Sequence, residues 1–255
     1  MDDYPKMITP PNHVEPVPRR IRAVHGGDVV VDTVAARYVW ESAYYPQYYL
    51  PRGDVAEHLL VSDGRTEETP RGSAQLFWLA ADGVEGPPAA RLLVEAEPPE
   101  LRGTFRFEWD AFDHWFEEDE EVFVHPRNPY GRVDALRSTR VVRIELDGVV
   151  LAESASPVLV FETGLPTRYY LNRTEVRFEH LVPTATVTRC PYKGTTTSYW
   201  SAVVDGAVHA DLAWCYDFPT RQLLPIAGLV AFYNERVDVF IDDEPVARPR
   251  THLAH

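Results

Sequence analysis

The amino-acid sequence predicts a mostly β protein made of two tandem copies of one small β domain. Two observations support this fold class. The 255-residue chain matches itself when it is shifted by 121 residues, so that Gly27 aligns with Gly148. A repeat of that length has the size of a domain rather than of a solenoid unit. Short runs of alternating apolar and polar residues also recur along the chain, which is typical of antiparallel strands.

Matched residues at constant spacing carry the repeat. Glu41 aligns with Glu162, and 48–50 aligns with 169–171, both Tyr-Tyr-Leu. Near the end of each half the offset becomes 124 residues, which implies a short insertion between the two matches. The pairs at this second offset are Trp109 with Tyr233, Phe116 with Phe240, and the acidic run 118–120 with 242–244.

Composition suggests where the domains begin and end. Five prolines within the first 18 residues predict an extended N-terminal arm, residues 1–19. A segment rich in proline and glycine follows His125 and predicts a linker, residues 128–140. The first, divergent β domain would then span 20–127, and the second β domain, with intact motifs, would span 141–255.

The second half illustrates the strand pattern. Residues 142–148 alternate apolar and polar and end in Asp147-Gly148, a hairpin signal. Asp205-Gly206 marks another tight turn. Two segments, 54–60 and 174–181, fit either a single helical turn or a strand. The remaining expected strands are 149–152, 157–162, 184–189, 199–204, 208–214 and 236–242.

Charge and composition exclude several classes of protein. The net charge is −14, whereas nucleic-acid binders and polybasic membrane-surface proteins need a basic face. No apolar run approaches the length of a membrane span, and the N-terminus lacks the apolar core of a secretory signal. The two cysteines exclude a disulfide scaffold and a four-thiolate zinc site. We therefore expect a cytoplasmic protein that binds neither nucleic acid nor membrane.

Three segments of the second half combine turn residues with reactive or aromatic side chains. They are 162–170, which contains Arg168-Tyr169-Tyr170, then 190–194, which reads Cys-Pro-Tyr-Lys-Gly, and 214–216, Trp-Cys-Tyr. With Tyr199-Trp200 and 228–233 they form an ordered series. In this series the second half resembles the domain-of-unknown-function family 427, known from bacteria and fungi and also labelled nucleotidyltransferase-like.

The resemblance implies a small β-tent-like domain and no known activity. This sequence contains neither the phosphate loop nor the metal-carboxylate signature that would support the transferase label. No His-x-x-x-His or Cys-x-x-Cys spacing occurs either, so we expect no protein metal site. The sequence assigns no cofactor and no oligomeric state.

Cys190 and Lys193 are the predicted catalytic residues. Cations at positions 189 and 193 would favour the nucleophilic thiolate of Cys190, although a small buried residue at a strand end is the plainer interpretation. Lys193 could form a Schiff base, transfer protons, anchor an anion or simply be solvated. Cys215 alternates with two aromatic neighbours and is expected in the core.

A set of aromatic and charged residues is predicted to bind the ligand. Arg168 could pair with Glu162 across the intervening turn or bind an anionic substrate group. The aromatic residues could line a cavity, although small β cores contain many such rings. The predicted ligand-binding residues are Arg168, Tyr169, Tyr170, Tyr192, Tyr199, Trp200, Trp214, Tyr216 and Glu162.

The first copy keeps only part of this set. Alignment of the aromatic pairs places Arg71 against Lys193 and Gln47 against Arg168, and no thiol faces Cys190. We interpret the first copy as degenerate, with two different sites as the alternative. The leading hypothesis is a small-molecule site in the second domain, with Cys190 or Lys193 active in an enzyme. The alternatives are a non-enzymatic ligand-binding or sensing module, and a structural or protein-interaction domain.

Overall fold

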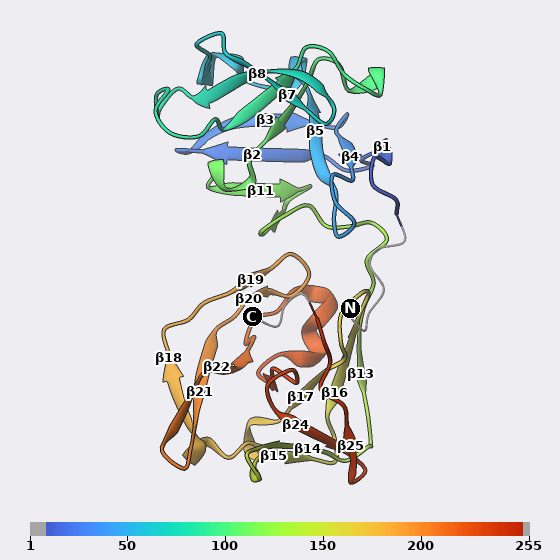
Figure 1. Cartoon of the computed structure of the whole chain (residues 1–255), viewed down its shortest axis with the longest axis vertical. Helices are drawn as coiled ribbons and strands as arrows, with labels where there is room; N and C mark the ends of the chain where they lie inside the picture. Colours follow the sequence, from blue (N-terminus) through green and yellow to red (C-terminus); the bar gives the residue numbers. More distant parts are fainter. Residues whose placement is uncertain (1–8, 252–255) are drawn as a thin grey trace. The chain divides into compact units, whose positions relative to one another are not determined.

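A computed structural model describes residues 9–251 of the chain. The chain divides into two compact units between Asn128 and Pro129, and the regular structure of both is mostly antiparallel β, with short 3-10 helices between strands (Figure 1). The prediction of a mostly β protein with two similar domains is confirmed. Among residues 9–251 there is no helix of the length and apolar character that crossing a membrane requires.

The first domain contains a larger and a smaller sheet. The larger sheet has the strand order β1-β4-β5-β10-β9-β8-β6, with β7 paired to β8, and the smaller has the order β12-β11-β2-β3. The bounds are β1 Val14–Pro16, β2 Ile21–His25, β3 Asp28–Thr33, β4 Arg37–Val39, β5 Gln47–Pro51, β6 Leu60–Val61, β7 Thr66–Thr69, β8 Gly72–Leu79, β9 Ala90–Leu93, β10 Thr104–Phe107, β11 His114–Glu117 and β12 Glu120–Val122.

The second domain repeats this arrangement. Its larger sheet runs β13-β16-β17-β23-β22-β21-β18, its smaller sheet runs β15-β14-β24-β25, and β19 pairs with β20. The bounds are β13 Val133–Arg137, β14 Val142–Leu146, β15 Val149–Ser154, β16 Val158–Glu162, β17 Arg168–Leu171, β18 Leu181–Thr184, β19 Arg189–Cys190, β20 Gly194–Thr195, β21 Ser198–Val204, β22 Ala207–Cys215, β23 Val230–Phe232, β24 Asp238–Ile241 and β25 Glu244–Val246.

The two domains agree in local irregularities as well as in strand order. The register shifts between Ala23 and Val24 where β2 meets β3, and between Ile144 and Glu145 where β14 meets β15. An isolated bridge joins Val31 to Val55 in one domain and Ala152 to Val176 in the other. All of these positions differ by the 121 residues of the sequence repeat.

Short 3-10 helices fill the segments that sequence patterns left undecided. In each domain two single turns precede an edge strand, and they fall in the segments 54–60 and 174–181 or just before them. The expected strand 184–189 is instead mostly irregular, because β18 ends at Thr184. The 3-10 helices are η1 Arg52–Asp54, η2 Glu57–Leu59, η3 Pro99–Leu101, η4 Trp109–Ala111, η5 Arg173–Glu175, η6 Phe178–His180 and η7 Arg221–Ile226.

Two proline-containing segments form edge strands that the sequence did not predict. Strand β1 lies within the expected arm and pairs with β4, so that Val14 faces Val39. Strand β13 lies within the expected linker and pairs with β16. Each lies at the corresponding edge of the larger sheet of its own domain. Strand β1 ends in Pro16, which is tolerated because an edge strand leaves some N–H groups unpaired, whereas β13 itself contains no proline.

The larger sheet of the second domain separates two apolar clusters. Side chains of successive residues point to opposite faces of a strand, so Tyr169 and Cys215 pack in one cluster, whereas Tyr170 and Trp214 pack in the other. The predicted core position of Cys215 is confirmed, since it is completely buried. The candidate site lies on the side of Tyr170 and Trp214.

Candidate functional site

The Cys-Pro-Tyr-Lys-Gly segment forms a tight turn between β19 and β20. Cys190 pairs with Gly194 across the hairpin, and Gly194 has a φ of +96°, a conformation that other residues rarely adopt. The carbonyl of Lys193 accepts a hydrogen bond from the Thr220 amide at 3.1 Å. The Thr220 hydroxyl donates to the Tyr192 carbonyl at 2.5 Å, so Thr220 holds the turn through two hydrogen bonds.

Lys193 is a buried cation in contact with a carboxylate and a thiol. Its side chain is 10% exposed, and its ammonium group forms an ion pair with Glu162 at the end of β16. The same nitrogen lies 3.8 Å from Sγ of Cys190. Burial alone would lower the pKa of Lys193, but the neighbouring charges, that of Glu162 above all, raise it beyond its ordinary value. Lys193 is therefore protonated at neutral pH.

The two cysteines differ in accessibility. Cys190 is partly exposed, whereas Cys215 is buried. Sγ of Cys215 lies 3.2 Å from an Arg173 nitrogen and 3.3 Å from a carboxylate oxygen of Asp217. Burial, the largest effect, raises the pKa of the Cys215 thiol, although Arg173 acts in the opposite direction. Cys190 is thus the more exposed of the two cysteines.

Four aromatic residues form a connected cluster next to Lys193. The indole of Trp214 donates to the hydroxyl of Tyr170 at 3.2 Å, and its ring centre lies 4.4 Å from that of Tyr233. The hydroxyls of Tyr233 and Tyr199 are 2.8 Å apart. Burial raises the pKa of Tyr170 to about 12, against the lowering effect of the Lys193 charge. The Tyr170 hydroxyl therefore stays neutral at ordinary pH.

Arg168 is neutralised inside the domain. Its guanidinium forms two hydrogen bonds with the carboxylate of Glu235, at 2.5 and 2.7 Å, and a third with Asn234. Both side chains of the ion pair are almost fully buried, at 8% and 3% exposure. The partner of Arg168 is thus Glu235 and not Glu162, which pairs with Lys193. With a bidentate carboxylate already bound, Arg168 fixes the end of β17.

The predicted site residues fall on two sides of the sheet. Tyr170, Tyr199, Trp214 and Tyr216 share the cluster beside Lys193, and Tyr192 is a half-buried residue of the turn. Tyr169 and Trp200 instead pack in the opposite cluster with Cys215. Sequence reasoning missed Asn234 and Glu235, although a buried arginine requires an acidic partner and these residues directly follow the motif that ends at Tyr233.

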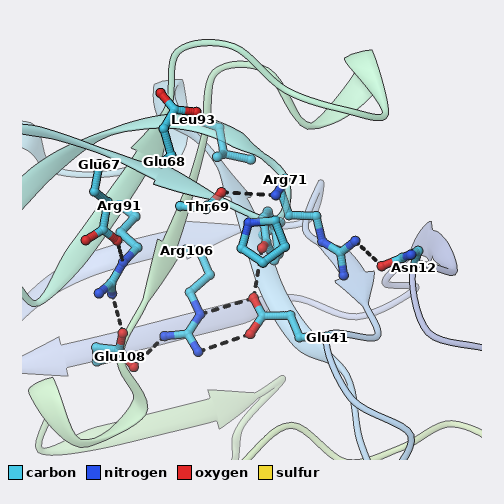
Figure 2. A pocket seen from close by; sticks show the side chains of 12 residues that line it. Asn12, Glu41, Glu67, Glu68, Thr69, Arg71, Arg91, Leu93, Arg106 and Glu108 are labelled. Atoms are coloured by element: carbon cyan, nitrogen blue, oxygen red, sulfur yellow. Dashed lines mark hydrogen bonds and ion pairs between the residues drawn. The ribbon is translucent and has the colours of Figure 1, made fainter.

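The equivalent turn of the first domain carries Arg71. Its carbonyl accepts a hydrogen bond from the Glu97 amide at 2.8 Å, as the Lys193 carbonyl does from Thr220. Glu41, the counterpart of Glu162, does not reach Arg71 but accepts a hydrogen bond from Tyr49 at 2.8 Å and pairs with Arg106. A cavity of about 340 Å³ adjoins these residues (Figure 2).

Strand register explains why the two sites differ in charge. Arg106 faces Tyr49 and Arg91 in the first domain. At the same positions of the second domain, Ala231 faces Tyr170 and Trp214. The facing residues of these strands are therefore mainly charged in the first domain and apolar or aromatic in the second. The first domain thus has a cavity with a charged lining at this place, and the alternative of two different sites stays a prediction.

A family model described as "Domain of unknown function (DUF427)", with the short label NTP_transf_9, matches residues 13–118 and again 134–243. The chain belongs to this family. It contains two DUF427 domains. The first match includes the edge strand β1, and the second begins within the edge strand β13. A search of curated proteins found no match. The family description names no activity, so the function has to be argued from the two DUF427 sites themselves.

Proposed function

We propose that the second DUF427 domain binds a small molecule at Cys190, beside the fixed positive charge of Lys193. The supporting observation is that a buried ammonium group contacts both the Glu162 carboxylate and the thiol of Cys190, a partly exposed residue. A buried ion pair is seldom more stabilising than apolar residues of the same size. Strongly perturbed charged groups gather at functional sites, which favours a functional role for this pair.

The contacts divide the roles among the predicted residues. Lys193 is protonated and bound to Glu162, so it supplies a positive charge rather than a free amine for a Schiff base. Arg168, paired with Glu235, is a positioning residue. Cys190 is the ligand-facing group, and any covalent chemistry at this site belongs to its thiol. Ligand binding is the function that these contacts support best, ahead of catalysis.

A cytoplasmic location is part of this proposal. Both cysteines are free thiols, and a ligand-facing thiol such as Cys190 requires a reducing compartment to remain available. The net charge of −14 supports a small-molecule ligand over a nucleic acid, because phosphate backbones bind basic surfaces.

A metabolite-binding screen on the full chain tests the proposal. Wild type, Cys190→Ala and the matched control Cys215→Ala would each be incubated with a metabolite mixture, and retained compounds would be identified by mass spectrometry. We expect a compound that wild type and Cys215→Ala retain and Cys190→Ala releases. Identical sets of compounds on all three folded proteins would refute a ligand at Cys190.

A further inference from the structure

Arg71 is a buried cation without a carboxylate partner. The residue is 6% exposed. Its guanidinium donates to the side-chain oxygen of Asn12 and to the Trp40 carbonyl at 3.2 Å, and both acceptors are neutral. Its Nε atom is buried with no hydrogen-bond partner. Within residues 9–251 Arg71 forms no ion pair, so a positive charge is uncompensated in the interior of the domain.

The natural partner of Arg71 is held by other residues. In the second domain, Glu162 pairs directly with the cation of the turn. In the first domain, Glu41 is bound by the Tyr49 hydroxyl and by two nitrogens of Arg106, at 3.3 Å each. An uncompensated buried charge is costly, and a bound anion removes that cost. The arrangement therefore leaves a place for an anion from outside the protein.

The other two arginines around the cavity are already paired, whereas the exposed Glu68 forms no ion pair within residues 9–251. Arg91 bridges Glu67 and Glu108, and Arg106 also meets Glu108, at 2.5 Å. Figure 2 shows this chain of ion pairs on one side of the cavity and Arg71 with Asn12 on the other. The cavity thus offers one cation in need of an anion, and several carboxylates that can accept further hydrogen bonds.

We propose that the first DUF427 domain binds a small amino or hydroxy acid in this cavity. The ligand carboxylate pairs with the guanidinium of Arg71, whose planar N–H groups suit that anion. The ammonium group of an amino acid donates to the carboxylates of Glu41 and Glu108, and the hydroxyl of a hydroxy acid donates to one of them. A volume of about 340 Å³ lies at the lower end of ligand cavities. A phosphate dianion would be repelled by these acidic residues.

This site is separate from the one at Cys190, and its test does not depend on that proposal. Binding of the twenty proteinogenic amino acids and of lactate, malate and citrate to the full chain would be measured by calorimetry. Amines and alcohols of the same carbon skeleton, without the carboxylate, and inorganic phosphate serve as comparison ligands. Amino acids and hydroxy acids form separate arms, which identify the second functional group.

We expect at least one acid to bind wild type, with at least about tenfold weaker binding by Arg71→Met, because a charge-assisted hydrogen bond is lost. Arg71→Lys should bind with intermediate affinity, since it keeps the charge and loses the planar fork. Arg65→Met, which removes an exposed arginine of the same domain outside the cavity, should bind as wild type does. No binding by any acid, equal binding by wild type and Arg71→Met, or Arg71-dependent binding of phosphate alone would overturn the proposal.

Discussion

Lys193 and Arg71 occupy the same position of equivalent turns, yet only Lys193 meets a carboxylate. The ammonium of Lys193 is bound to Glu162, whereas Glu41, at the corresponding place, is bound to Arg106 and Tyr49. One scaffold therefore holds a compensated buried cation in its second copy and an uncompensated one in its first. This difference leads to opposite expectations for the same substitution in the two domains.

Replacement of Lys193 by methionine should destabilise the second domain. The substitution leaves Glu162, whose side chain is 12% exposed, without its cation, and breaking a buried pair in this way costs about 3 kcal/mol or more. Adding Glu162→Gln should restore a large part of the loss, because the unpaired charge is then gone. Urea unfolding of the full chain measures both effects. Equal stability of wild type and Lys193→Met would contradict the buried ion pair.

Replacement of Arg71 by methionine should change the stability of the unliganded protein by less than about 1 kcal/mol, since an apolar side chain of similar length removes an uncompensated charge. The Trp40 carbonyl keeps a second donor, the Asn12 amide at 2.9 Å. The same urea series, run beside Lys193→Met, gives the comparison. A loss as large as that of Lys193→Met would show that Arg71 has a structural partner.

The pair of Arg168 and Glu235 should make the second domain sensitive to acid. Burial would raise the pKa of Glu235, but hydrogen bonding and the charge of Arg168 lower it below its ordinary value of 4.5. A lowered pKa in the folded state gives stability that is complete above pH 4.5 and is lost as the pH falls further. Glu235→Gln should flatten the decline of unfolding free energy below that pH. An unchanged slope would speak against the ion pair.

Alkylation should distinguish the two thiols. Cys190 is partly exposed, whereas Cys215 is buried and has a raised pKa, so iodoacetamide should modify Cys190 first in the folded protein. Peptide mass spectrometry at several times and pH values assigns the modified residue. Cys215→Ser provides the control, since its labelling rate at Cys190 should match that of wild type. Modification of Cys215 before Cys190 would contradict the burial of Cys215 and the exposure of Cys190.

Much of the fold was predictable because its signals are local or repeated. The 121-residue offset locates two domains, and alternation predicts strands such as β14 and β24. Strands β1 and β13 were missed because prolines near them suggested an arm and a linker, whereas their pairing with β4 and β16 is decided by the sheet edge. The helical turns of 54–60 could not be predicted, because so short a segment does not distinguish the residue spacing of a helix from that of a strand.

The sites were less predictable because their contacts join distant residues. The partner of Arg168 is 67 residues away in Glu235, and no local pattern specifies it. Glu41 pairs with Arg106, which lies 65 residues later in the sequence and on a distant strand. Lys193 and Cys190 belong to one hairpin, so their closeness in sequence was visible, whereas the 3.8 Å between Nζ and Sγ was not.

The register shift shared by β2 with β3 and by β14 with β15 has a consequence for engineering. An extra residue in a strand reverses the facing of every side chain beyond it. Because both copies keep this irregularity at the same place, equivalent residues of these two hairpins face the same way in both domains. The hairpin of β2 and β3 and the hairpin of β14 and β15 could therefore be exchanged in a chimera with the facing of their side chains preserved.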